Sequence, residues 1–293
     1  MSSLRVNNVQ FGYKKKKILK DIGFDISNGI VGILGPNGAG KSTLMKILAS
    51  VISHDEGDIL INGISYKENV YDIKKMIGYL PQDFYVYPNI KGREFLEFIA
   101  KIKTGKSKAE IKLMIDEIIN ITGIKAYESK YIKTYSGGIR QRLGIAQALI
   151  GEPKILLIDE PTSGLDSESR KDFLRLLQDL SKDKIILFTS HIIDDIEYCC
   201  NQLIIIQDGK ITYDGNREQL IKKSKSHVWE IYTDIDSYEE IVKTGKTLDM
   251  EYIDNRVKAR FISKQVYENG AINFDPSLQE AYLCHIWENS NNE

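Results

Sequence analysis

The sequence predicts an α/β fold in which helices cover a mainly parallel sheet, followed by a small α+β domain. Two observations support this prediction. Short aliphatic runs alternate with helical periodicity over residues 155–207, as expected for strands joined by crossover helices. A short buried strand at residues 30–34 leads directly into a glycine-rich loop and then a helix. After about residue 226 the elements change in kind and order, which indicates a second, smaller unit.

The N-terminal part is predicted to be rich in strands. Leu4–Phe11 alternates weakly between apolar and polar residues, and a second strand at Ile18–Ile26 follows a lysine-rich turn. That turn, Lys14–Lys17, could bind phosphate, but the simpler interpretation is a solvated connection between two strands. The other elements expected here are a helix at 41–50 and strands at 57–61 and 77–80.

A helical insertion is predicted next, over about residues 89–150. Phe95, Phe98, Ile99 and Ile102 recur at helical spacing within 91–121, and Gly137–Ile150 is helical by the same criterion. The core then resumes with alternating elements: strands at 155–159, 185–190 and 203–207, and helices at 167–180 and 192–199. This alternation is the reason for expecting a parallel sheet.

The C-terminal residues are predicted to form a separate accessory domain. A polar stretch at 216–226 precedes a strand at 227–234 and a short helix at 237–243. A hairpin at 247–262, turning near Asp254-Asn255, and a helix from Ser277 complete it. We therefore expect domains at 1–220 and 221–293.

Composition limits the classes of function. The chain has 293 residues, of which 42% are hydrophobic, and its net charge is -1. A nearly neutral chain has no long-range field to hold a polyanion, so no nucleic-acid partner is expected. The absence of an 18-residue apolar run, or of a signal-type segment in Met1–Arg5, favours a cytoplasmic protein that reaches a membrane only through a partner. Three cysteines suit a reducing compartment, and the adjacent Cys199 and Cys200 lack metal-ligand spacing.

A phosphate-binding loop is the most specific motif. Residues 35–42 fit the pattern GxxxxGK[ST]. In this pattern the glycines let successive N–H groups point at phosphate oxygens, and the next helix directs its positive end at the same anion. Lys41 would contact the β- and γ-phosphates, and Ser42 would offer a hydroxyl to Mg²⁺. The expected nucleotide-binding residues are Gly35, Pro36, Asn37, Gly38, Ala39, Gly40, Lys41, Ser42 and Thr43.

Two further features suit chemistry on that phosphate. The buried strand 155–158 ends in Asp159 and Glu160, at the sheet edge where active sites of open α/β sheets lie. Asp159 suits Mg²⁺, and Glu160 could polarise a water in line with the γ-phosphate. Ser136 is a natural N-cap, and with the bare Gly137 and Gly138 it makes a second helix start that favours anions.

Together these motifs resemble the ATP-binding-cassette (ABC) ATPase family, over roughly residues 4–220 and in the family's order. Tyr135–Ile139 resembles the LSGGQ signature, with Tyr in place of Leu and Ile in place of Gln. Gln82 resembles the Q-loop glutamine, Ser163–Asp166 the D-loop, and His191 the switch histidine. Tyr13 stands where the family places a ring against adenine, and Phe11 is the other candidate.

The resemblance implies a P-loop NTPase core sheet, an N-terminal antiparallel β subdomain and a helical signature subdomain. It also implies a head-to-tail dimer in which Ser136, Gly137, Gly138 and Asp166 of one chain close over ATP held by the other. Lys41, Glu160, His191 and Gln82 would then be catalytic. Mg²⁺ would be held by Ser42, Gln82 and Asp159, with ATP and Mg²⁺ as the cofactors.

The expected role is the ATPase of a transporter whose integral-membrane permease subunits are separate chains. The cassettes would form a homodimer, or a heterodimer with a paralogue, on the inner face of the membrane. The aromatic region Asp83–Ala100 suits docking of a permease, and Pro276–Leu283 resembles the tail of ABC-2-type exporter subunits, which favours export. The alternatives are an ABC ATPase acting on nucleic acid or ribosomes, and a nucleotide-dependent regulatory module. Two observations speak against them. The chain has a single cassette without long heptad helices or a basic face, and its catalytic set is complete.

Overall fold

A computed structural model describes residues 3–14, 16–243, 245–265 and 270–291. Met1 and Ser2 of the N-terminal segment, and Lys15 of the lysine-rich turn, lie outside the described residues. The chain divides into two compact units, Met1–Asp214 and Gly215–Glu293. Residue 220, the expected boundary, falls inside helix α8 (Arg217–Ser224). No helix among the described residues combines the length and apolar character needed to cross a membrane.

The first unit contains an antiparallel sheet in the strand order β2-β1-β4-β5. Alternate side chains of its long strands are buried, as the weak alternation in the sequence predicts. The pair Tyr13–Lys16 lies at the β1–β2 turn. The strands are β1 (Leu4–Tyr13), β2 (Lys16–Ile26), β4 (Glu56–Ile61) and β5 (Ile64–Ser65).

The core of this unit is a six-stranded sheet in the order β10-β9-β3-β8-β7-β6. Every residue of β3, β7 and β8 is buried, because helices cover both faces of a parallel sheet. Since β3, β8 and β7 are parallel neighbours, the loops after them meet at one edge of the sheet. The strands are β3 (Ile30–Leu34), β6 (Ile77–Leu80), β7 (Ile155–Asp159), β8 (Ile185–Thr189), β9 (Gln202–Gln207) and β10 (Lys210–Asn216).

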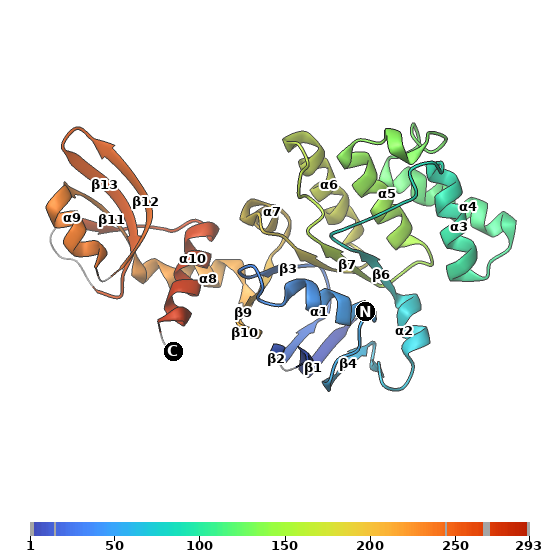
Figure 1. Ribbon diagram of the computed structural model, residues 1–293, viewed down its shortest axis with the longest axis horizontal. Coiled ribbons are helices and arrows are strands. Elements are labelled where there is room, and N and C mark those ends of the chain that lie inside the picture. Colours follow the sequence, from blue (N-terminus) through green and yellow to red (C-terminus); the bar gives the residue numbers. More distant parts are fainter. Residues whose placement is uncertain (1–2, 15, 244, 266–269, 292–293) are drawn as a thin grey trace. The chain divides into compact units, whose positions relative to one another are not determined.

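Helices of two kinds belong to this unit (Figure 1). Four follow or precede core strands: α1 (Lys41–Leu48), α2 (Val70–Met76), α6 (Ser167–Leu180) and α7 (Ile193–Cys199). Three others pack together as the helical insertion: α3 (Gly92–Thr104), α4 (Lys108–Thr122) and α5 (Gly137–Leu149), with a 3-10 turn at Ile132–Thr134 before α5. The helical stretch expected at 91–121 is two helices, because Gly105 ends α3 in a left-handed conformation and Ser107 caps α4.

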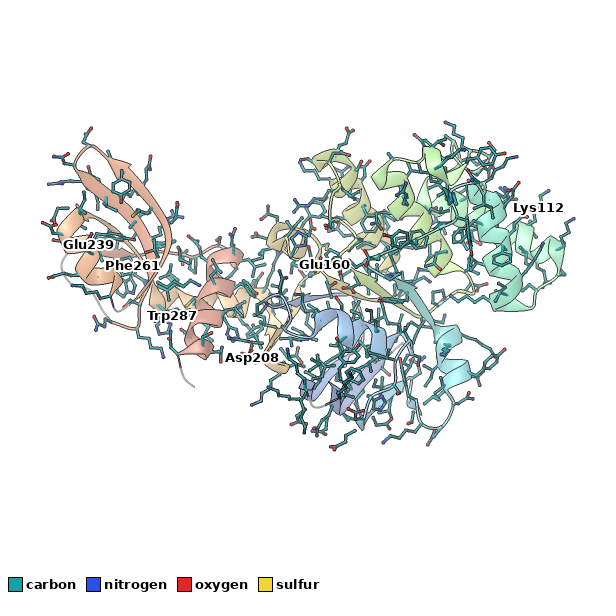
Figure 2. The ribbon with its side chains drawn as sticks, in the orientation of Figure 1. Lys112, Glu160, Asp208, Glu239, Phe261 and Trp287 are labelled. Atoms are coloured by element: carbon teal, nitrogen blue, oxygen red, sulfur yellow. The ribbon has the colours of Figure 1, made fainter. Side chains whose placement is uncertain are left out.

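The described residues of the second unit form a four-stranded antiparallel sheet, in the strand order β12-β13-β11-β14, and three helices. Its core includes Val257 and Phe261 on one side and Cys284 and Trp287 on the other (Figure 2). The polar stretch expected as a connection contains α8, which Asn216 caps. The other elements are β11 (Val228–Asp234), α9 (Ile235–Val242), β12 (Lys246–Ile253), β13 (Arg256–Ile262), β14 (Ala271–Asn273) and α10 (Leu278–Ser290), with a 3-10 turn at Lys225–His227.

Candidate active site

The loop between β3 and α1 has a shape that only glycine permits at two positions. Gly35 has a φ of 154°, and a Cβ there would lie 2.2 Å from the carbonyl oxygen of Ile206 in β9. Gly40 has a φ of 108°, and its Cβ would lie 2.6 Å from the side chain of Leu19. The loop is therefore pressed against the neighbouring strands, which fixes its backbone before any ligand binds.

Lys41 begins α1 and is 6% exposed. Its ammonium donates to the carbonyl oxygens of Gly35 at 2.7 Å and Pro36 at 3.2 Å, so it sits inside the curve of the loop. Burial lowers its pKa, and the carboxylates of Glu160 and Asp159 act in the opposite direction. A buried cation whose partners are neutral carbonyls is stabilised when an anion binds beside it. The terminal phosphates of ATP are expected to be that anion.

Asp159 ends β7 and is buried beside the start of α1. Its Oδ1 accepts from the Thr189 hydroxyl at 2.6 Å and from the Ser42 hydroxyl at 3.3 Å. Burial raises its pKa, while these two hydrogen bonds act to lower it. Mg²⁺ prefers oxygen ligands and a site that can neutralise its charge, so a carboxylate and a hydroxyl this close together fit such an ion. Asp159 and Ser42 meet as the sequence predicts, although 117 positions separate them.

Glu160, labelled in Figure 2, lies at the same edge of the sheet, and Gln82 and His191 both contact its carboxylate. Its Oε2 accepts from Gln82 Nε2 at 3.2 Å and lies 3.3 Å from His191 Nδ1. Its backbone has a φ of 47°, unusual for a residue with a side chain, and its N–H donates to the Thr189 carbonyl and hydroxyl oxygens. Such a conformation persists only where the surroundings hold it, and it occurs often at functional sites.

These groups surround one cavity of about 710 Å³. It brings together the phosphate loop, Gln82, Glu160 and His191. Three of the predicted loop residues do not line it: the carbonyl oxygens of Gly35 and Pro36 accept from Lys41, and Ala39 is buried. The residues that line it are Lys16, Ile18, Asn37, Gly38, Gly40, Lys41, Ser42, Thr43, Gln82, Glu160 and His191.

Tyr13 lies near this cavity without lining it. The residue is 52% exposed, and its ring packs edge-on against Phe11, with 4.8 Å between the ring centroids. Its cross-strand partner Lys16 does line the cavity. Phe11 is buried, so of the two rings only Tyr13 has a face open to a ligand.

The N-terminus of α5, residues 136–138, is the second anion-binding position that the sequence predicts, and it does not line this cavity. Ser136 caps α5, with its hydroxyl accepting from Ile139 N at 3.4 Å, and Ser136 and Gly137 are exposed. Gly138 is buried, because a Cβ there would lie 2.9 Å from the Ser169 hydroxyl. Asp166 caps α6 through the N–H groups of Glu168 and Ser169, and these bonds lower its pKa. Among the described residues that line the phosphate cavity, none belongs to 136–138 or 163–166.

Sequence reasoning missed Thr189, which binds both Asp159 and the backbone of Glu160. It also missed the buried Asp195, which accepts hydrogen bonds from Thr162 and Ser190. Their only signal in the sequence is their place: Thr189 ends β8, and Asp195 lies in the first turn of the next helix, α7. Sheet order is needed to see that the two strand ends are neighbours.

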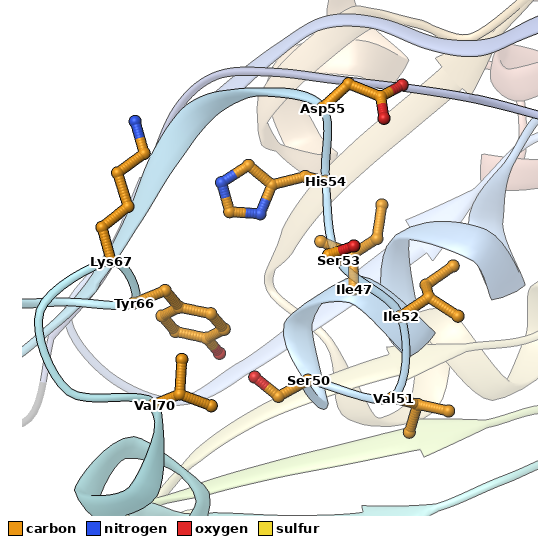
Figure 3. A pocket seen from close by; sticks show the side chains of 10 residues that line it. All are labelled: Ile47, Ser50, Val51, Ile52, Ser53, His54, Asp55, Tyr66, Lys67 and Val70. Carbon is orange, nitrogen blue, oxygen red and sulfur yellow. The ribbon is translucent and has the colours of Figure 1, made fainter.

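Two of the other cavities in the described part of this unit are smaller than the phosphate cavity. One of about 460 Å³ is bordered by Phe84, Tyr85 and the loop before α5. The other, of about 300 Å³, lies between the end of α1 and residues 66–70, where the Tyr66 hydroxyl donates to the Leu48 carbonyl (Figure 3). Residues 35–43 and 159–160 do not line this cavity of about 300 Å³, so it is separate from the phosphate cavity.

Comparison with known proteins agrees with this geometry. The family model for the ABC transporter matches residues 19–163. The uncharacterized ABC transporter ATP-binding protein YxlF of Bacillus subtilis is 35% identical over 227 residues, which are 77% of this chain and 75% of that protein. The chain belongs to the ABC transporter family. The linearmycin resistance ATP-binding protein LnrL of Bacillus subtilis is 33% identical over 75% of this ABC protein and 71% of its own length.

A solved structure supports the same assignment. It is a dimeric ATP-binding cassette in a post-hydrolysis state with ADP and Pi, 26% identical, with a TM-score of 0.66 over 73% of this chain and 98% of that one. The expected ABC ATPase fold is confirmed, with its antiparallel β subdomain and parallel core. This ABC protein is an ATP-binding and ATP-hydrolysing subunit of a transporter.

Proposed function

We propose that this ABC ATPase drives export through separate integral-membrane permease subunits, as a head-to-tail dimer that encloses two molecules of ATP. The observation that carries the dimer is the exposed start of α5. Ser136 and Gly137 offer a helix N-terminus to an anion, yet they do not line the cavity of their own phosphate loop. A nucleotide held by a second copy, or by a paralogue, would supply that anion.

In such a dimer the γ-phosphate is shared by two chains. Lys41 and the loop amides hold it from one side, and the N–H groups at the start of α5 of the other chain hold it from the opposite side. Asp166, exposed at the start of α6, would lie at the same interface. Loss of the γ-phosphate removes the contact that distinguishes the closed dimer from the open one, so ATP binding closes the dimer and hydrolysis opens it.

Glu160 is the general base in this proposal. Its Oε2 is the atom that faces Gln82 and His191, so a water bound there would be oriented by both side chains. Lys41 offsets the charge that develops on the transferred phosphoryl group. Mg²⁺, held by Ser42 and Asp159 with Gln82, would supply further charge neutralisation. Tyr13 would stack on the adenine ring with its exposed face.

The permease is proposed to bind beside the Q-loop. Tyr85 and Tyr87 are 88% and 84% exposed, and Phe98 of α3 is exposed as well. Phe84 and Phe95 contact each other and are half-buried. The cavity of about 460 Å³ next to Gln82 would receive a helix of the permease, so that docking and catalysis share one loop. Through this partner the protein would lie on the inner face of the cell membrane.

Export is favoured over import for two reasons. The resistance protein LnrL is among the relatives, and the C-terminal segment Pro276–Leu283 resembles the tail of ABC-2-type exporter subunits. Co-purification of the chain from membranes with a multi-span protein tests the partner. If the chain stayed entirely in the soluble fraction of cells that also produce the membrane proteins encoded next to it, the proposed permease partner would be contradicted.

The catalytic assignment is tested by Glu160→Gln, which keeps the size of the side chain and removes its basicity. We expect ATP hydrolysis to fall at least about tenfold, with ATP binding retained. Glu117→Gln is the control, because Glu117 is an exposed carboxylate on α4. Undiminished phosphate release by the Glu160 variant would refute the assignment.

A further inference from the structure

The carboxylate of Asp195, at the start of α7, is 0% exposed and accepts hydrogen bonds from three segments. Its Oδ2 accepts from the Thr162 hydroxyl at 2.5 Å and from the Ser190 hydroxyl at 3.2 Å. Its Oδ1 accepts from the guanidinium of Arg170 in α6. A buried charge is tolerated when it is paired and fully hydrogen-bonded, and this one meets both conditions.

The two hydroxyl groups belong to the two loops that carry the chemistry. Thr162 lies two residues after Glu160, and Ser190 directly precedes His191. Both hydroxyl-bearing residues are 1% exposed. One carboxylate oxygen therefore fixes the β7–α6 loop and the β8–α7 loop to each other, immediately next to the general base and the switch histidine.

The backbone of Glu160 explains why this connection matters. Its left-handed conformation costs about 1 kcal/mol or more and must be held from both sides of the chain. On the amino side its N–H is bound to Thr189. On the carboxyl side the first side-chain anchor within the protein is Thr162, through Asp195.

An ion pair with Arg170 is the simpler explanation of Asp195, but it accounts for only one of the three hydrogen bonds that the carboxylate accepts. The guanidinium occupies Oδ1, and the same arginine also reaches Asp194 at 4.0 Å. Neither contact explains why Oδ2 accepts from the hydroxyls of Thr162 and Ser190. A helix N-terminus also favours an acidic residue, but Asp194 occupies the first turn of α7 as well and remains exposed. Neither the ion pair nor the helix N-terminus therefore explains why Asp195 is buried and bonded to both loops.

We infer that Asp195 is a positioning residue that holds Glu160 and His191 in register through Thr162 and Ser190. This inference rests on the proposed roles of Glu160 and His191. Asp195 does not line the phosphate cavity, so it acts only through the two loops. A displacement of about 1 Å at a reacting group can reduce turnover up to about a hundredfold, while ground-state binding through the phosphate loop is retained.

The test is the pair Thr162→Val and Thr162→Ser in the full chain. Valine keeps the shape and removes the hydroxyl, whereas serine keeps the donor to Asp195. We expect Thr162→Val to lower kcat for ATP hydrolysis about tenfold or more, with the Kd for ATP changed less than about threefold. Thr162→Ser should restore kcat to within about threefold of the unmodified chain.

Thr122→Val is the matched control. Thr122 is also fully buried and its hydroxyl bonds the Ile118 carbonyl, but it lies in α4, outside both loops. It should leave kcat unchanged, which would show that losing a buried threonine hydroxyl elsewhere does not lower turnover as losing the Thr162–Asp195 hydrogen bond does.

Three results would overturn the inference, provided that Glu160→Gln lowers turnover as expected. They are an unchanged kcat in Thr162→Val, a parallel loss in Thr162→Ser, and a loss of ATP affinity as large as the loss in kcat. Asp195→Asn is a second probe, and it should lower kcat in the same way. If Glu160→Gln itself retained full turnover, the failure would lie in the proposed base rather than in Asp195.

Discussion

Gly35→Ala should deform the phosphate loop, and the structure sets the size of the effect. The added Cβ would lie 2.2 Å from the Ile206 carbonyl oxygen, whereas ordinary contacts begin at 3.4 Å. One of the two must therefore move by about 1 Å. Ile206 belongs to β9, which is fixed between β10 and β3, so the loop is the part that moves.

Two costs combine at this position. A side chain at the φ of 154° costs about 1–3 kcal/mol, and overpacking costs a similar amount. Because the loop amides must converge on the phosphate, we expect the affinity for ATP to fall at least about a hundredfold. A fluorescent-nucleotide titration measures this loss, and thermal unfolding measures the cost to the fold.

Gly63→Ala is the control for backbone strain. Gly63 also has a positive φ, 80°, but nothing lies within 4 Å of the position of a Cβ there, and it is in the β4–β5 turn. This variant should bind ATP normally. If Gly35→Ala also bound ATP with unchanged affinity, the loop would not be held against β9 as described.

Two further predictions concern the pKa values of buried groups. Burial raises the pKa of Asp159 above its unfolded value of about 4. Between these two pKa values the folded protein binds more protons than the unfolded chain, so the free energy of unfolding falls as pH rises. Asp159→Asn should remove that fall, which makes the nucleotide-free chain more stable at pH 7 in thermal unfolding; a less stable variant would contradict this. Burial raises the pKa of the Cys284 thiol to about 12, so at pH 8 about one molecule in 10⁴ carries a thiolate, and a maleimide should label the less buried Cys199 first. Faster labelling of Cys284 in the native protein would show that its burial is wrong.

Much of the fold could be predicted because most core strands and long helices carry a clear pattern. The fully apolar runs of β3, β7 and β8 are examples. Elements without such a pattern were missed. Helix α8 buries only Leu220 and Ser224, and β14 has three residues at a sheet edge. Strand β10 was missed although its turn, Asp208-Gly209 with both φ positive, is a strong hairpin signal.

The site was predictable wherever a motif names the residue. Lys41, Asp159, Glu160, Gln82 and His191 come together as expected. The supporting residues could not be found in this way. Asp195 and Thr162 are 33 positions apart, and they meet only because β7 and β8 are neighbours in the sheet. Strand order in a parallel sheet is set by the packing of the crossover helices, which no local pattern in the sequence records.

The shared grip on the γ-phosphate is tested most directly by the mass of the Glu160→Gln chain in solution. Light scattering should show a monomer of 33.4 kDa without nucleotide and twice that mass with ATP and Mg²⁺. Adding Gly137→Asp places a negative charge at the exposed start of α5 and should keep the ATP-bound chain monomeric. Asn120→Asp, an added charge on the exposed face of α4, should not. A Glu160→Gln chain that binds ATP and stays monomeric, or a dimer that Gly137→Asp leaves intact, would contradict the account.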